Sequence, residues 1–311
     1  MWTNFGLDRG AWQRASMVIT ALVGSLAIAA CGGAGVDRSS ADGGPGGPSG
    51  GTEGTATHLT VGVAFWHRGY KVTLGDAVIV PGTAGASVER VVTIGATFQN
   101  LGVDAGQFPS AMVLSSGGRH YTETAEQHEV PTVPGQAAGE GTIAFEADER
   151  FQLTDAVLTI GESDERQAVV PLAKPQSVVS LEPRTINVSG KAYAGPKVYA
   201  TISSVDLRAD NPRVHREIGS GYEWMLLHFT ATNDSAAGMA ILYEFDQRLV
   251  LPDGSAVSTS SSSCGNAQLH PGPYSTARDG VACFEVPVPV GGTYTYDISD
   301  SDSPGFTFTI N

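Results

Sequence analysis

VTIGATFQN, residues 92–100, and a matching stretch, MLLHFTATN, residues 225–233, decide the fold. In both, apolar side chains occupy every second position. The rows predicted to face a core are Val92, Ile94, Ala96 and Phe98 in the first stretch and Met225, Leu227, Phe229 and Ala231 in the second. The opposite rows are more polar. A period of two is that of a β-strand buried on one face, so each stretch is predicted to be a strand that ends in asparagine.

The two stretches belong to an internal repeat. GYKV at 69–72 matches GPKV at 195–198, an offset of 126 residues, whereas the two strands above are 133 residues apart. Three further matches are Val113–Gly117 with Val250–Gly254 and Pro134-Gly135 with Pro271-Gly272, both at 137, and Gly141–Glu146 with Gly280–Glu285 at 139. The offset only increases, as expected if the second copy carries insertions in its loops. The repeat predicts two domains, residues 58–174 and 178–311, joined near 173–177.

The remaining folded sequence also has the period of strands. Further strand-like runs are Thr142–Phe145, Ala156–Ile160, Ala168–Leu172, Val198–Leu207, Phe284–Val290, Tyr294–Ile298 and Phe306–Ile310. Pro-Gly, Asp-Gly and Gly-Gly pairs separate these runs, as turns between short strands do. No amphipathic pattern of helical length occurs. The expected fold class is therefore all-β, with two tandem immunoglobulin-like antiparallel β-sandwiches.

Several of these elements together resemble the DUF4352 family, immunoglobulin-like domains of secreted lipoproteins from actinobacterial and other Gram-positive lineages. The elements are Phe98–Asn100, Leu114–Gly117, Pro134-Gly135, Gly141–Glu146 and the strand-like segment Phe65–Val72. The resemblance covers most of residues 60–172 and, more loosely, 195–311. It implies a fold and a location in the cell envelope, and it carries over no catalytic residue.

The N-terminal sequence is typical of a lipoprotein signal peptide, residues 1–30. Arg9 and Arg14 precede an uncharged stretch at 15–30, which is shorter than the ~20 residues of a membrane span. Ile28-Ala-Ala-Cys31 resembles the bacterial lipobox, which implies lipid attachment at Cys31 and an acylated (palmitate-type) anchor. The expected location is the extracytoplasmic face of a bacterial cell membrane. The alternatives are an uncleaved membrane anchor or an ordinary signal with an accidental cysteine.

Residues 31–57 are predicted to be a flexible tether. Ten of the 26 residues from Gly32 to Thr57 are glycine, and Val36 is the only aliphatic side chain there larger than alanine. Such a segment has too little apolar surface to offset the entropy of ordering. As a Gly-rich coil it has a root-mean-square reach of roughly 30 Å.

Charge and composition exclude several functions. The 311 residues carry 18 Lys and Arg against 32 Asp and Glu, a net charge of −14, and all but one unit of it lies beyond residue 57. Nucleic-acid-binding surfaces are normally basic, so no nucleic-acid partner is expected. The seven histidines lack metal-ligand spacing, and the acidic loop Asp297–Asp302 lacks the glycine and glutamate of an EF-hand. Neither a metal nor another cofactor is expected.

Two groups of residues remain as candidate sites. Cys264 and Cys283 form the even remainder after Cys31, and exported proteins are exposed to oxidising conditions, so a disulfide is predicted. The alternative is two unrelated thiols. Trp66, His67 and Arg68 are a candidate exposed recognition patch, and the alternative is packing of the first strand at a sheet edge.

The expected function is that of a non-enzymatic binding or interaction module, because no catalytic spacing is found. Its partners would be the membrane, through the lipid, and a cell-envelope or secreted protein. The alternatives are an envelope hydrolase or modifying enzyme with a site between the domains, or a structural spacer or assembly factor.

Overall fold

The predicted strands are present in the structure, a computed structural model that describes residues 57–81, 90–109, 111–124, 127–236, 238, 240, 242, 246–259, 266–288, 290–298 and 304–311. Residues 1–56, which contain the predicted signal peptide, Cys31 and nearly all of the tether, lie outside the described residues. The described chain is almost entirely antiparallel β-structure, as expected, with two 3-10 turns, Leu153–Asp155 and Pro175–Ser177. No helix in this part of the chain is long and apolar enough to cross a membrane.

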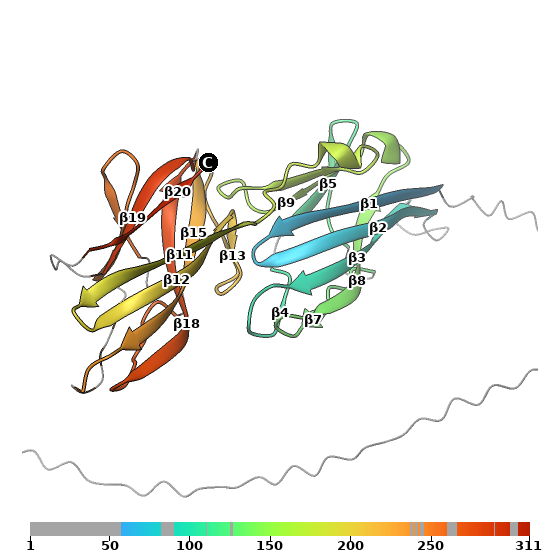
Figure 1. Cartoon of the computed structure of the whole chain (residues 1–311). Helices are drawn as coiled ribbons and strands as arrows, with labels where there is room; N and C mark the ends of the chain where they lie inside the picture. Colours follow the sequence, from blue (N-terminus) through green and yellow to red (C-terminus); the bar gives the residue numbers. More distant parts are fainter. Residues whose placement is uncertain are drawn as a thin grey trace, which may run out of the picture. The chain divides into compact units, whose positions relative to one another are not determined.

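The first sandwich is made of two four-stranded sheets. One sheet has the order β1-β2-β3-β8, with these strands side by side in Figure 1, and the other has the order β10-β9-β5-β6. The strands are β1 (Thr57–His67), β2 (Tyr70–Pro81), β3 (Arg90–Asn100), β5 (Met112–Ser116), β6 (Arg119–Tyr121), β8 (Ala138–Ala147), β9 (Val157–Ile160) and β10 (Ala168–Pro171). A short pair, β4 (Gly106–Gln107) and β7 (Thr132–Val133), lies outside these sheets.

The second sandwich repeats this topology. Its sheets have the orders β11-β12-β15-β18 and β20-β19-β16-β17, which match those of the first sandwich strand for strand. The strands are β11 (Arg184–Gly195), β12 (Val198–Arg208), β15 (Tyr222–Asn233), β16 (Gln247–Val250), β17 (Ala256–Ser258), β18 (Ser275–Pro287), β19 (Gly292–Ile298) and β20 (Phe306–Ile310). An additional pair, β13 (Asp210–Asn211) and β14 (Arg216–Glu217), has no described counterpart in the first copy.

The register of the strands confirms the internal repeat. Val92 in β3 lies opposite Phe145 in β8, and the repeat aligns these residues with Met225 in β15 and Phe284 in β18, which also lie opposite each other. The duplicated sequence therefore builds the same cross-strand pairs twice.

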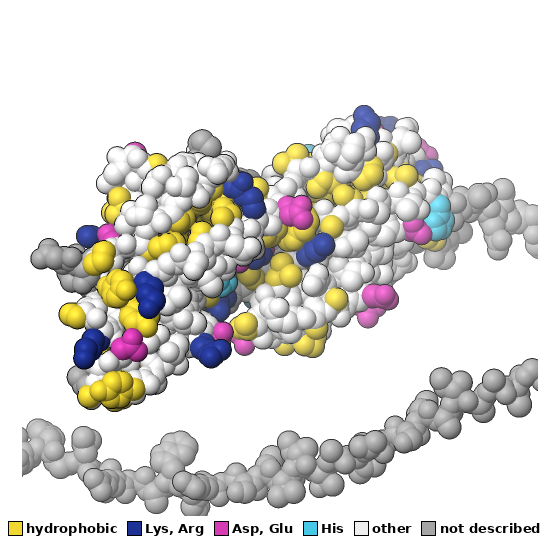
Figure 2. Space-filling model, in the orientation of Figure 1, with side chains coloured by type: hydrophobic (Ala, Val, Ile, Leu, Met, Phe, Trp, Pro, Cys, Tyr) yellow, Lys and Arg dark blue, Asp and Glu magenta, His cyan; other side chains and the backbone are white. Residues whose placement is uncertain are grey.

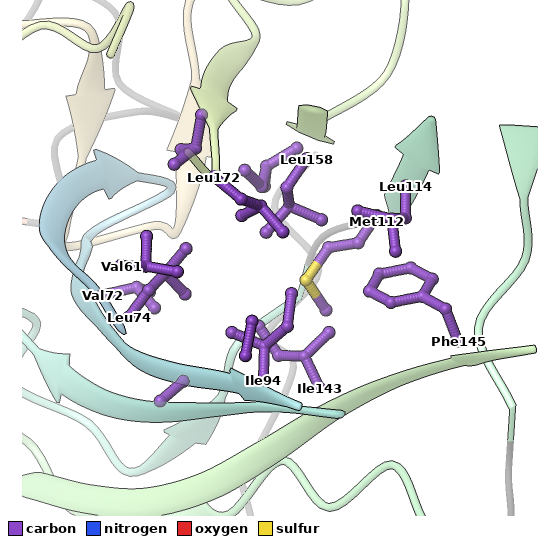
Figure 3. Close-up of a cluster of buried hydrophobic side chains, with 14 of the residues drawn as sticks. Val61, Val72, Leu74, Ile94, Met112, Leu114, Ile143, Phe145, Leu158 and Leu172 are labelled. Atoms are coloured by element: carbon purple, nitrogen blue, oxygen red, sulfur yellow. The ribbon is translucent and has the colours of Figure 1, made fainter. Parts of the chain in front are cut away.

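Each sandwich has its own core. The first gathers side chains from both of its sheets, among them Ile94, Leu114 and Leu158, which point toward one another in Figure 3. The second core lies between residues 192 and 310. All eight side chains of the predicted inward rows are at most 7% exposed, which confirms the alternation. Residues 52–311 nevertheless form one compact unit, so the structure does not separate the two copies as independent domains.

The outward row of β15 is more buried than its sequence indicates. Leu226 and Trp224 belong to a third apolar cluster with Ile218 and Val281, and Leu181 packs against it. His228, further along the same row, is half-exposed and lies 2.8 Å from Asp206 (Nε2 to Oδ2). One end of this face is thus covered and the other is open, and period-two patterning does not distinguish the two ends.

Candidate functional site

The candidate site begins at the turn between β1 and β2. Arg68 and Gly69 have φ angles of 45° and 79°, and His67 pairs with Tyr70 across them. Two consecutive positive φ angles characterise the tight hairpin turn that matches strand twist, and they favour glycine. A Cβ atom on Gly69 would lie 2.6 Å from the Cα of Pro212. The tip of this turn therefore packs directly against the β13–β14 pair of the second sandwich.

Two carboxylates of that pair bind the main chain of the turn. The Arg68 N–H donates to Glu217 Oε2 at 2.9 Å, and the Gly69 N–H donates to a carboxylate oxygen of Asp210. His215 Nδ1 lies 3.1 Å from the Arg68 carbonyl oxygen, and its ring stacks on Tyr70 at 5.2 Å between centroids. A hairpin of the first copy is thus held by one from the second copy.

Charged side chains surround these contacts. The Arg68 guanidinium pairs with Glu165 and donates to the Pro109 carbonyl at 2.8 Å. Arg208 Nε lies 2.7 Å from Asp210 Oδ1. We call the group formed by His67, Arg68, Glu165, Arg208, Asp210 and Glu217 the junction. Its two arginines balance Glu165 and Asp210, so its net charge depends on the protons of His67 and Glu217.

His67 is buried between two acidic side chains. It is 0% exposed, with Nδ1 3.3 Å from Glu217 Oε2 and Nε2 3.9 Å from Glu165 Oε2. Neither ring nitrogen has a hydrogen-bond partner. A Cβ on Gly161 would lie 2.7 Å from the imidazole Cε1, so the ring closely fills its space.

Burial moves the pKa values of these two groups in opposite directions. Desolvation lowers the pKa of His67 to about 4, against the raising effect of Glu165. Desolvation also raises the pKa of Glu217 to about 8; the charges of Asp210 and Glu165 add to this, and the Arg68 N–H opposes it. In both cases burial disfavours the charged form. At pH 7 the imidazole is therefore neutral, the Glu217 carboxyl is protonated, and the junction carries no net charge.

This arrangement is suited to holding a proton in a closed interface. Among the described residues no hydroxyl or thiol hydrogen-bonds to His67, so no nucleophile is paired with the imidazole. No group of three or more metal-ligating side chains occurs in the described part of the chain either. The carboxyl group of Glu217 and the carboxylate of Asp210 accept hydrogen bonds from main-chain N–H groups of the turn.

The candidate recognition patch of Trp66, His67 and Arg68 is wrong as an exposed surface. His67 is buried, and the Arg68 guanidinium is paired with Glu165. Trp66 is half-buried, and its main chain exchanges two hydrogen bonds with Ser180 Oγ at 2.9 and 3.2 Å. The main chain of Trp66 thus bonds to the segment that follows the first sandwich, and the main chain of Arg68 bonds to the β13–β14 pair, so the three residues do not form one exposed surface.

Sequence reasoning missed Glu165, Asp210 and Glu217. A signal for two of them was present, because the offset between the copies rises from 126 to 133 between the GYKV match and the following strand. The second copy therefore has seven more residues there, and the segment that contains them forms β13 and β14. Glu165 has no comparable signal.

The cysteine predictions remain predictions. Cys283 is buried in β18, and its Sγ lies 3.6 Å from Asn211 Nδ2. Its proposed partner Cys264 and the lipidation residue Cys31 lie outside the described residues. Most of the acidic loop after Asp297 does as well, and Asp297 itself pairs with Arg248.

Comparisons with known proteins add little. No protein-family model and no curated protein matches the chain. Two solved structures from Bacillus anthracis are similar to it. One is a conserved hypothetical protein, with 10% identity and a TM-score of 0.31 over 41% of this chain and 99% of that one. The other is a conserved domain protein, with 12% identity and a TM-score of 0.25 over 82% and 81%. Scores this low support no argument about fold or function.

Proposed function

We propose that the chain is a lipid-anchored bacterial lipoprotein on the extracytoplasmic face of the cell membrane, where its paired sandwiches act as a non-enzymatic binding module. The observation that carries the binding role is how the junction is used. Its carboxyl groups accept hydrogen bonds from main-chain N–H groups of the neighbouring sandwich, so Glu217, whose pKa is raised by burial, serves to hold the two sandwiches together. The lipobox-like sequence before Cys31 and the Gly-rich segment after it support the location.

Lipidation is tested with Cys31→Ala. The wild-type chain should enter the membrane fraction and incorporate a labelled fatty acid, because two or three acyl chains anchor stably where a single chain is marginal. Cys31→Ala should lose the label and appear in the soluble fraction. Cys283→Ala, which keeps Cys31, is the matched control and should stay labelled. A Cys31→Ala protein that remains membrane-bound would show that lipid is not the anchor.

The binding role is tested without assuming a docking surface. On the face shown in Figure 2, acidic and basic side chains are interspersed and hydrophobic side chains lie in several separate places, so this face does not single out one region. The full chain in vesicles is offered cell-wall fragments, secreted proteins and a small-ligand library. Saturable binding to one class supports the proposal, and none in any class contradicts it.

The alternative is an envelope hydrolase or modifying enzyme. It is favoured by one observation, the oppositely shifted pKa values of His67 and Glu217, since such pairs occur in catalytic sites. Burial of both side chains argues against it, because substrate has no access to them. Turnover of an envelope substrate that is lost in His67→Gln but kept in His228→Gln would replace the binding proposal with this one.

A disulfide between Cys264 and Cys283 is part of the proposal for an exported chain. It would close a loop with 18 residues between the cysteines, which is worth about 3 kcal/mol in the loop-entropy model. Non-reducing peptide mapping of protein exported by its host should recover the two cysteine peptides as one linked species, and recovery of both thiols free would contradict the bridge.

A further inference from the structure

We propose that the junction is a proton-dependent joint: the two sandwiches are held together while His67 and Glu217 are both uncharged, and the contact loosens when either takes a charge. The inference concerns how the sandwiches are coupled and is independent of where the protein is anchored.

The joint is polar, so charge can control it. None of the three apolar clusters of buried residues has members from both sandwiches: the first contains residues 61–172, and the others lie between residues 192 and 310. Across the joint the described polar contacts are hydrogen bonds, the close approach of His67 to Glu217 and the stacking of His215 on Tyr70. Besides those of the turn, the Arg166 N–H donates to the Ile218 carbonyl at 3.1 Å, and Arg166 Nη2 donates to the Tyr222 carbonyl at 3.2 Å. Non-directional apolar contact, which is insensitive to pH, contributes little here.

The groups that face His67 and Glu217 come from every element packed against them. Arg68 belongs to the β1–β2 turn, Glu165 and Arg166 to the segment between β9 and β10, Arg208 to the end of β12, and Asp210 to β13. His215, between β13 and β14, contacts the Arg68 carbonyl and Tyr70. Arg68 and Arg208 are each already paired with a carboxylate, that of Glu165 and that of Asp210. Arg166 favours the charged form of Glu217, but burial and the charges of Asp210 and Glu165 outweigh it.

Each limb of the pH response has a distinct cause. Above about pH 8 the Glu217 proton is lost, and a buried carboxylate is then added beside Asp210 and Glu165. Below about pH 4 His67 gains a proton inside a site from which water is excluded. Taking either charge out of water is costly, and for both groups this desolvation is the largest effect on the pKa. Opening the contact removes the cost, because it returns the group to water. The joint is therefore closed between these two limits.

Amide hydrogen exchange of the full chain tests the alkaline limb. The reporters are the Arg68 and Gly69 N–H groups, because they donate across the joint to the carboxyl group of Glu217 and to the carboxylate of Asp210. After correction for intrinsic exchange, their protection should fall about tenfold between pH 7 and pH 9, as expected when a group with a pKa near 8 ionises and the open form prefers the charged state. Amides within the β3–β8 ladder, such as that of Val92, should change less than twofold.

Two variants separate charge from packing. Glu217→Gln keeps the shape of a protonated carboxyl and cannot ionise, so its Arg68 and Gly69 amides should change less than twofold over the same pH range. Glu182→Gln removes an exposed carboxylate outside the junction and should behave as wild type. The proposal is overturned if wild-type protection at the turn changes no more than at Val92, or if Glu217→Gln loses as much protection as wild type. If Glu217→Gln does not fold, the wild-type comparison of the turn with Val92 decides alone.

Discussion

Replacing Asn100 by alanine should destabilise the protein by about 3 kcal/mol, and the size follows from the contacts of this side chain. Asn100 ends β3, is 0% exposed, and holds the segment after it. Its Nδ2 donates to the carbonyls of Asp104 at 2.8 Å and Val133 at 3.1 Å, and its Oδ1 accepts from the Gly102 N–H at 2.8 Å. Alanine leaves two buried main-chain groups without partners, each costing about 1–3 kcal/mol.

The duplication supplies a matched position. Asn233 ends β15 at the equivalent place, where its Nδ2 donates to the Gly238 carbonyl at 3.0 Å and its Oδ1 accepts from the Ser235 N–H at 3.0 Å. These bonds are only partly buried, so water can replace some of what is lost. Asn233→Ala should therefore cost less, about 1–2 kcal/mol. Asn187→Ala, on an exposed position of β11, should stay within about 0.5 kcal/mol of wild type.

The measurement is urea unfolding of the three variants and wild type, followed by tryptophan fluorescence, with the midpoint and slope fitted separately. Trp66 lies in the first sandwich and the buried Trp224 in the second, so tryptophans on both sides of the junction contribute to the signal. An Asn100→Ala variant as stable as Asn187→Ala would refute the reasoning that these asparagines hold the segments after β3 and β15.

Two further predictions concern the junction. Glu217 has a raised pKa, so its contribution to stability is lost as pH rises through about 8, whereas His67, with its pKa lowered to about 4, contributes stability that is lost as pH falls below 6.5. Between pH 6.5 and 8 the effect of Glu217 is the larger, and the free energy of unfolding should fall by about 1 kcal/mol, because the folded Glu217 is half ionised at pH 8 and the unfolded His67 is half protonated at pH 6.5. Urea unfolding at both pH values that gave equal or greater stability at pH 8 would contradict this. Gly69→Ala should destabilise the protein by at least about 1 kcal/mol more than Gly62→Ala, as measured by thermal or urea unfolding. Both glycines have a positive φ, but only at Gly69 would the new Cβ clash with Pro212. Equal destabilisation by the two variants would show that this clash has no effect on stability.

Burial is predicted best from the sequence in strands whose side chains alternate between apolar and polar and whose apolar face packs on a single core. The inward rows of β3 and β15 are buried as their alternation indicates, and the matched segments form equivalent strands because the pattern is local. β13 and β14 are two residues each, too short to show any period. Leu226 belongs to a buried cluster whose other members, such as Val281, are distant in the chain, so its burial cannot be inferred from its own strand.

The sequence draws attention to Trp66, His67 and Arg68 but predicts the wrong environment for them, an exposed patch. The acidic side chains that contact His67 and Arg68 are distant in the sequence: Glu165 is 97 residues from Arg68, and Glu217 is 149. The local sequence of β1 contains no pattern from which such distant neighbours could be predicted. The one indication is that the second copy is seven residues longer in the segment that contains Asp210 and Glu217.

The chemistry of the junction indicates that it contributes orientation more than stability. Removing a charged group from water costs several kcal/mol, and the attraction between two buried charges often does no more than offset this cost. Well-packed apolar side chains of similar size would therefore stabilise the contact between the sandwiches at least as much. Apolar contact is non-directional, however, whereas an N–H donor and a carboxylate acceptor bond well only within a narrow range of geometry. The hydrogen bonds from Arg68 and Gly69 thus select one arrangement of the turn against β13 and β14. The same buried charges make that arrangement sensitive to a single proton, so the two sandwiches can be released from each other under conditions that leave both apolar cores intact.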